Sequence, residues 1–213
     1  DFVETVAISN DNRFIVSGGD DKSIKIFDLE TRKQIVYIRD AHKERISAIA
    51  VTPDNRYIVS GSGDHSIKVL SIADNQFEDH FKNAHEGRIT SLAISSNSQV
   101  IVSASEDNSI KIFDRITHKE IHQFKDAHEG PIYCVKITPD DNFIISSSED
   151  NSIKIFDINT KKQVHHFKDV HQGNQFRNFT HLTPSYRAYN INCNKSKWRL
   201  LSFRITGQIN KSL

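Results

Sequence analysis

The chain has 213 residues, of which 37% are hydrophobic and 26% charged, and its formal net charge is +1. This length can bury a sizeable core, and the longest apolar runs, about six residues as in 46–51, exclude a membrane-spanning helix, which needs about 18. Two cysteines, Cys134 and Cys193, are too few for a disulfide framework, and no secretory leader opens the chain, so we expect an intracellular, cytoplasmic protein.

The charge is unevenly distributed along the chain. Residues 174–213 contain seven Lys or Arg and no acidic residue, whereas residues 1–173 carry a net charge of −6. We therefore expect two regions, 1–173 and 174–213. The chain contains no methionine and begins with Asp1, which indicates a piece of a longer protein.

A period of 43 residues runs through the first region. The segment 103–114 matches the segment 146–157 at eleven of twelve positions. Such a fixed period is the signature of a repeat architecture. Histidine, aspartate and serine each recur at this spacing, as His42, His85, His128 and His171, as Asp21, Asp64, Asp107 and Asp150, and as Ser17, Ser60, Ser103 and Ser146.

Each unit is predicted to form four short strands. In the second unit the strands are expected at 46–51, 57–62, 66–71 and 75–81, since β-branched and aromatic runs alternate there with turn residues. Four-stranded units of about 40–45 residues are typical of the blades of a β-propeller. The predicted fold is thus all-β, with four clear antiparallel blades and a possible degenerate fifth blade.

The motifs of these units resemble those of the WD-repeat family over at least residues 1–173. The family has Gly-His before the inner strand, and this chain has Asp-Ala-His at 40–42 and 126–128. Where the family ends the third strand in Trp-Asp, this chain has Phe-Asp at 27–28, 113–114 and 156–157, and Leu70-Ser71 in the second unit. Because propellers of this family usually close with more blades, the resemblance implies part of a larger propeller.

The resemblance also implies a hydrogen-bonded set of His, Ser, Asp and Trp in each blade. In the second blade it would join Ser60 and Asp64 to either His42 or the histidine of the adjoining loop. Phenylalanine has no indole N–H, so that link is missing here. The recurring His, Asp and Ser residues are therefore interpreted as structural.

Two sharper interpretations of these residues are disfavoured. An enzyme needs a single Ser-His-Asp triad at one active site, whereas this set of serine, histidine and aspartate recurs in every unit. Metal ligands must converge at about 2.0–2.3 Å on one ion, whereas histidines found once per blade lie too far apart. We expect no catalytic residue, cofactor or metal site, and no small-molecule substrate.

Partner contacts in WD-repeat proteins concentrate on the top face, so the resemblance implies binding residues there. These are the residues three and five positions after the loop His and the residue before the turn Asp. They are Arg45, Arg88 and Pro131, then Ser47, Thr90 and Tyr133, and then Asp20, Glu106 and Glu149.

The expected function is a protein-interaction scaffold. The alternative is a substrate-selecting module of a larger enzyme whose catalytic domain lies outside this chain. Residues 174–213 have three interpretations: a degenerate fifth blade, a misread or truncated sequence, or a basic and aromatic segment that binds RNA or an acidic membrane surface. Nucleic acid is the least favoured of the partners considered.

Overall fold

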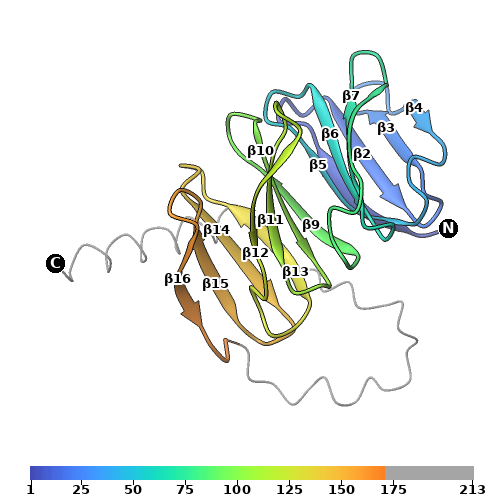
Figure 1. Ribbon diagram of the computed structural model, residues 1–213. Coiled ribbons are helices and arrows are strands. Elements are labelled where there is room, and N and C mark those ends of the chain that lie inside the picture. The colour runs from blue at the N-terminus through green and yellow to red at the C-terminus, as the bar shows by residue number, and fades with distance from the viewer. Residues whose placement is uncertain (171–213) are drawn as a thin grey trace. The chain divides into compact units, whose positions relative to one another are not determined.

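A computed structural model describes residues 1–170 of the chain (Figure 1). These residues form four antiparallel sheets, each made of four strands consecutive in the sequence. The sheets are here called blades 1 to 4 in chain order. Blade 1 contains β1 (Val3–Ile8), β2 (Phe14–Gly19), β3 (Ile24–Asp28) and β4 (Gln34–Ile38), and blade 2 contains β5 (Ile46–Val51), β6 (Tyr57–Ser62), β7 (Ile67–Ser71) and β8 (Phe77–Phe81). Blade 3 contains β9 (Ile89–Ile94), β10 (Val100–Ser105), β11 (Ile110–Asp114) and β12 (Lys119–Phe124), and blade 4 contains β13 (Ile132–Ile137), β14 (Phe143–Ser148), β15 (Ile153–Asp157) and β16 (Lys162–Phe167). The prediction of four-stranded antiparallel blades is confirmed.

The expected strands of the second blade agree closely with the structure. β5 and β6 have the predicted bounds, whereas β7 starts one residue later and β8 two residues later than expected. Ser66 belongs to the preceding turn, because its amide donates to Asp64 Oδ1 at 3.0 Å. Asn75 has a φ of 59° and closes the turn between β7 and β8. Local turn hydrogen bonds thus shorten both strands.

The turns of all four blades share one backbone design. Within residues 1–170, sixteen non-glycine residues have positive φ, and they fall at four positions of the 43-residue repeat. Ten of the sixteen are Asn or Asp, the residues that best tolerate the left-handed conformation. The four sets are Asn12, Asn55, Ser98 and Asp141; Lys22, His65, Asn108 and Asn151; Arg32, Asn75, His118 and Lys161; and Asp40, Asn83, Asp126 and Asp169.

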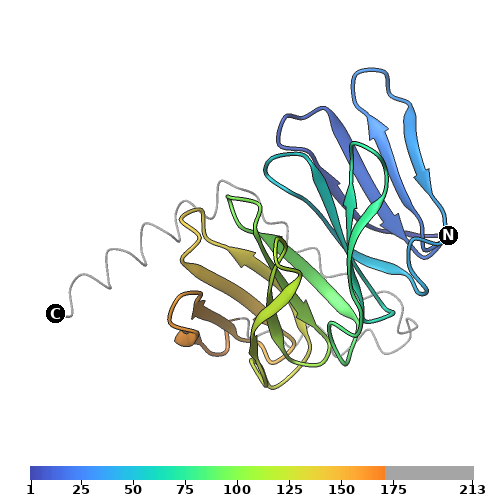
Figure 2. The same ribbon diagram turned by 45° about the horizontal axis from the view of Figure 1, so that its top comes forward.

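Neighbouring blades pack face to face in chain order, through their inner strands β1, β5, β9 and β13 (Figure 2). The third strand adds an aromatic contact in the position where the family has tryptophan. The ring of Phe113 lies 4.8 Å from that of Phe81 in the preceding blade. The ring of Phe156 lies 4.6 Å from that of Phe124. The aromatic side chain therefore serves the interface between blades without an indole N–H.

The outward face of blade 1 is not covered by any described residue. On β1, Val3, Val6 and Ile8 are each more than half exposed. Since β1 packs on one side against β5 only, the four blades form an open arc, consistent with part of a larger propeller. No helix in the described residues is long and apolar enough to cross a membrane.

Candidate functional site

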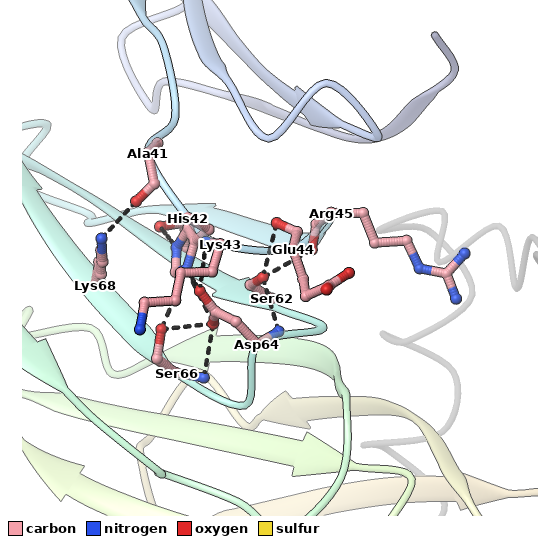
Figure 3. A network of polar contacts seen from close by, with 10 residues as sticks. Ala41, His42, Lys43, Glu44, Arg45, Ser62, Asp64, Ser66 and Lys68 are labelled. Atoms are coloured by element: carbon pink, nitrogen blue, oxygen red, sulfur yellow. Dashed lines mark hydrogen bonds and ion pairs between the residues drawn. The ribbon is translucent and has the colours of Figure 1, made fainter.

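A buried hydrogen-bonded cluster pins the inner part of blade 2 (Figure 3). His42, in the loop before β5, contacts Ser60 Oγ through Nε2 at 2.8 Å and Asp64 Oδ2 through Nδ1 at 3.1 Å. The amide of Lys43 donates to the same carboxylate oxygen at 2.8 Å. Of the two histidines considered from the sequence, the cluster thus uses His42 and not the histidine of the adjoining loop.

The same cluster recurs in blades 3 and 4. His85 contacts Asp107 at 2.9 Å and Ser103 at 2.7 Å. In blade 4, His128 contacts Asp150 at 2.8 Å and Ser146 at 2.7 Å. Each histidine lies with its own serine and aspartate in its own blade.

The cluster of blade 4 fits a neutral His128, since burial lowers the pKa of this histidine. Nδ1–H donates to the carboxylate, and Nε2 accepts the serine hydroxyl proton. Ser60 and Ser103 have no exposed surface, so no substrate can reach these hydroxyl groups. Across residues 1–170, no group of three or more His, Cys, Asp or Glu could hold a metal ion. The hydrogen bonds of each cluster hold together the loop before the inner strand, the second strand and the turn that follows the second strand.

Each cluster contains a second serine that the sequence analysis missed. Ser66 Oγ donates to Asp64 Oδ1 at 2.6 Å and lies 3.2 Å from His42 Nδ1. Ser109 and Ser152 occupy the same place in blades 3 and 4. A signal was present, because serine follows the turn aspartate by two residues in every unit.

Blade 1 has a different arrangement. No histidine contacts Ser17 or Asp21 among the described residues, and Asp21 pairs instead with Lys25 Nζ at 2.6 Å. Asp21 also accepts the hydroxyl proton of Ser23 at 2.7 Å. Burial acts to raise the pKa of Asp21, but the hydrogen bonds from Lys25 and Ser23 outweigh it and lower the pKa to about 2.

The buried clusters should make the protein less stable as the pH falls. Burial lowers the pKa of His128, even though Asp150 acts to raise it. The pKa of Asp150 lies well below its usual range, because hydrogen bonds from Ser152 and His128 outweigh the effect of burial. Compared with the folded protein, the unfolded chain binds more protons at His128 below about pH 6.5 and at Asp150 below about pH 4. The free energy of unfolding therefore falls as the pH is lowered through these ranges.

Thermal unfolding followed by circular dichroism from pH 8 to pH 3 checks this expectation. The midpoint temperature should begin to fall below about pH 6.5 and fall more steeply below about pH 4. A midpoint that stays constant or rises over that interval would contradict the assignment of a neutral imidazole to His128.

An open hollow lies at one edge of blades 1 to 3, where the loops before the inner strands meet the turns between second and third strands. We call this edge the top face. The hollow has a volume of about 550 Å³. Its lining includes four of the residues predicted for partner binding, namely Asp20, Arg45, Arg88 and Glu106. The other lining residues are Lys22, Glu44, Gly63, His65 and Gly87.

One backbone hydrogen bond gives the top face the same geometry in each blade. The amide of the residue before the turn Asp donates to the carbonyl of the residue three positions after the loop His. The two predicted contact positions therefore lie side by side. The pairs are Asp20 with Phe2 at 3.1 Å, Gly63 with Arg45 at 2.9 Å, Glu106 with Arg88 at 3.0 Å and Glu149 with Pro131 at 2.9 Å.

The remaining predicted contact residues do not line this hollow. Ser47 and Thr90 are bulge residues of β5 and β9, where the pairing register shifts. A bulge redirects the side chain, and both hydroxyl groups donate to the next blade, to the carbonyls of Ile89 and Ile132. Tyr133 is the bulge residue of β13.

Three further expectations fall elsewhere. Pro131 and Glu149 belong to blade 4, outside the hollow of blades 1 to 3. His171 and the region 174–213 lie outside the described residues. Partner binding by Ser47, Thr90, Tyr133, Pro131 and Glu149 stays a prediction, and so do the interpretations of the tail.

Four-stranded meander blades that pack in chain order, with the same buried cluster in blades 2 to 4, define a β-propeller repeat protein. A family model described as "WD domain, G-beta repeat" matches residues 1–28, 33–71, 77–114 and 118–157, more than half of the chain. The chain belongs to the WD-repeat family. A comparison with the curated proteins found no match. Domains of this family generally bind other proteins and are typically not catalytic.

Proposed function

We propose that this chain is an interaction scaffold that binds partner proteins through the top-face hollow of blades 1 to 3. The observation that carries the proposal is the convergence of Asp20, Arg45, Arg88 and Glu106, from three different blades, on one open hollow. Arginine is among the residues enriched in binding hot spots. The buried clusters beneath hold these loops rigidly, which lowers the entropy lost on binding.

Replacing Arg45 and Arg88 together by alanine should abolish or strongly weaken partner binding. The full chain, immobilised and incubated with a lysate of its source cells, is compared with Arg45→Ala/Arg88→Ala by quantitative mass spectrometry of the captured proteins. We expect a set of proteins that wild type retains and this variant loses.

Arg13→Ala/Arg56→Ala is the matched control. Both residues are exposed and lie in turns between first and second strands, at the opposite edge of blades 1 and 2. The control removes the same charge and should keep the captured set. Retention of the whole set by Arg45→Ala/Arg88→Ala would overturn the proposed function.

A further inference from the structure

Arg45, a basic residue of the top-face hollow, has no acidic residue at the repeat position where blade 3 has one. In blade 3, Arg88 forms an ion pair with Glu106 at 2.6 Å, on the two positions that the shared backbone hydrogen bond brings together. In blade 2 the corresponding positions are Arg45 and Gly63. The same backbone geometry is present, but the carboxylate is missing.

No described residue replaces that carboxylate. The guanidinium of Arg45 makes no hydrogen bond or ion pair with any of residues 1–170. Figure 3 shows its side chain extending away from the buried cluster around Asp64 and away from Glu44. Arg45 is only half-buried and lines the open hollow, so an incoming group can reach it.

The space beside Arg45 can be located from Gly63. A Cβ atom on Gly63 would lie 3.7 Å from Arg45 Cγ and 3.3 Å from Glu44 Cβ. The φ of Gly63 is not positive, so the backbone does not require glycine there. A side chain at this position would run alongside Arg45, as Glu106 does beside Arg88.

We propose, on the basis of the proposed function, that Arg45 binds the carboxylate of an Asp or Glu side chain of the partner protein, in the place that Gly63 leaves open. Guanidinium and carboxylate form parallel, charge-assisted hydrogen bonds that fix both position and orientation. The hollow is lined by three cationic residues, Lys22, Arg45 and Arg88, and three acidic residues, Asp20, Glu44 and Glu106. This balance favours a single acid flanked by neutral residues over a strongly acidic segment.

Peptide selection on the full chain tests the proposal. Peptides are selected from a random, unphosphorylated displayed library, so that any selected anionic side chain is a carboxylate. Their dissociation constants are then measured by fluorescence anisotropy for wild type, Arg45→Ala, Arg45→Ala/Arg88→Ala, Gly63→Glu, Gly63→Gln and the control Arg13→Ala/Arg56→Ala. Gly63→Glu places an internal carboxylate beside Arg45, and Gly63→Gln has nearly the same shape without the charge.

We expect an Asp or Glu that recurs at one position of the selected peptides. Arg45→Ala and Gly63→Glu should each weaken binding at least about tenfold, as expected for a hydrogen-bonded charge pair, whereas the control Arg13→Ala/Arg56→Ala should retain it. Gly63→Gln occupies the same space without a charge, so we expect it to weaken binding less than Gly63→Glu does. Changing the recurrent acid to its amide should weaken binding to wild type by a similar factor and have little further effect on Arg45→Ala. This last comparison holds even where a Gly63 variant does not fold.

Two results would overturn the inference and leave the proposed function standing. One is a set of selected peptides without a recurrent acid that still lose binding to Arg45→Ala/Arg88→Ala. The other is a recurrent acid whose change to the amide weakens binding to Arg45→Ala as much as binding to wild type, which would mean that Arg45 does not hold the acid. Unchanged binding to Arg45→Ala/Arg88→Ala would instead overturn the proposed function itself.

Discussion

Replacing Asp107 by alanine is expected to lower the free energy of unfolding by about 3 kcal/mol, because it removes several hydrogen bonds to a carboxylate and leaves buried donors without an acceptor. Its carboxylate accepts hydrogen bonds from His85 Nδ1, the Glu86 amide and both the amide and hydroxyl of Ser109, all between 2.7 and 2.9 Å. The side chain of His85 is fully buried, so no water can replace the lost acceptor. Urea unfolding followed by circular dichroism measures the change.

Blade 1 offers the matched control for this change. Asp21 occupies the same position of the repeat, but no histidine of the part of the chain that the structure describes contacts it, and its side chain is 27% exposed. Asp21→Ala removes hydrogen bonds that water can partly replace, and we expect a loss of about 1 kcal/mol. Equal losses for Asp21→Ala and Asp107→Ala would contradict the stabilising role of the histidine cluster.

A methyl group added at Gly61 should destabilise the protein by about 2 kcal/mol, because it overfills the interface between blades 2 and 3. A Cβ atom there would lie 2.5 Å from Ile89 Cγ2 and 3.1 Å from Ile89 Cβ. Ile89 is fully buried and has no room to withdraw. The second strand of blade 2, β6, and the inner strand of blade 3, β9, would have to move apart.

Gly130→Ala provides the control for Gly61→Ala. Its added Cβ would meet its nearest neighbour at 3.5 Å, an ordinary contact, and its φ is not positive. Chemical unfolding of the two variants should show a clear loss for Gly61→Ala and almost no change for Gly130→Ala. A loss below about 0.5 kcal/mol for Gly61→Ala would show that the blades adjust their spacing freely.

The fold could be predicted from the sequence because the same local pattern is repeated in each unit. β-Branched runs, turn residues and the 43-residue period all indicate the same four-stranded unit, and β5 and β6 have the expected bounds. The shorter β8 was not foreseen, because Asn75 adopts a left-handed conformation that its residue type permits but does not require.

The candidate site could be predicted only in part, because the sequence indicates the repeat positions of its residues but not the directions of their side chains. Positions related by the repeat located Arg45 and Arg88 on the top face, where the structure brings them together. The direction of Ser47 and Thr90 depends on a bulge in each inner strand, and a bulge is set by pairing with a neighbouring strand rather than by the residue itself. The absence of an acid at position 63 could be interpreted only from the structure, which shows that Gly63 lies beside Arg45 as Glu106 lies beside Arg88.

The third strands β3, β11 and β15 have identical sequences, Ile-Lys-Ile-Phe-Asp. By side-chain packing alone, any of them could therefore pair with the second strand of another blade. Chain connectivity discriminates between them. If β15 replaced β11 beside β10, a loop roughly twelve times longer would replace the turn 106–109, at an added closure cost of about 2 kcal/mol. Short turns thus do for these blades what sequence differences do in less repetitive proteins: they keep each strand with its own partners.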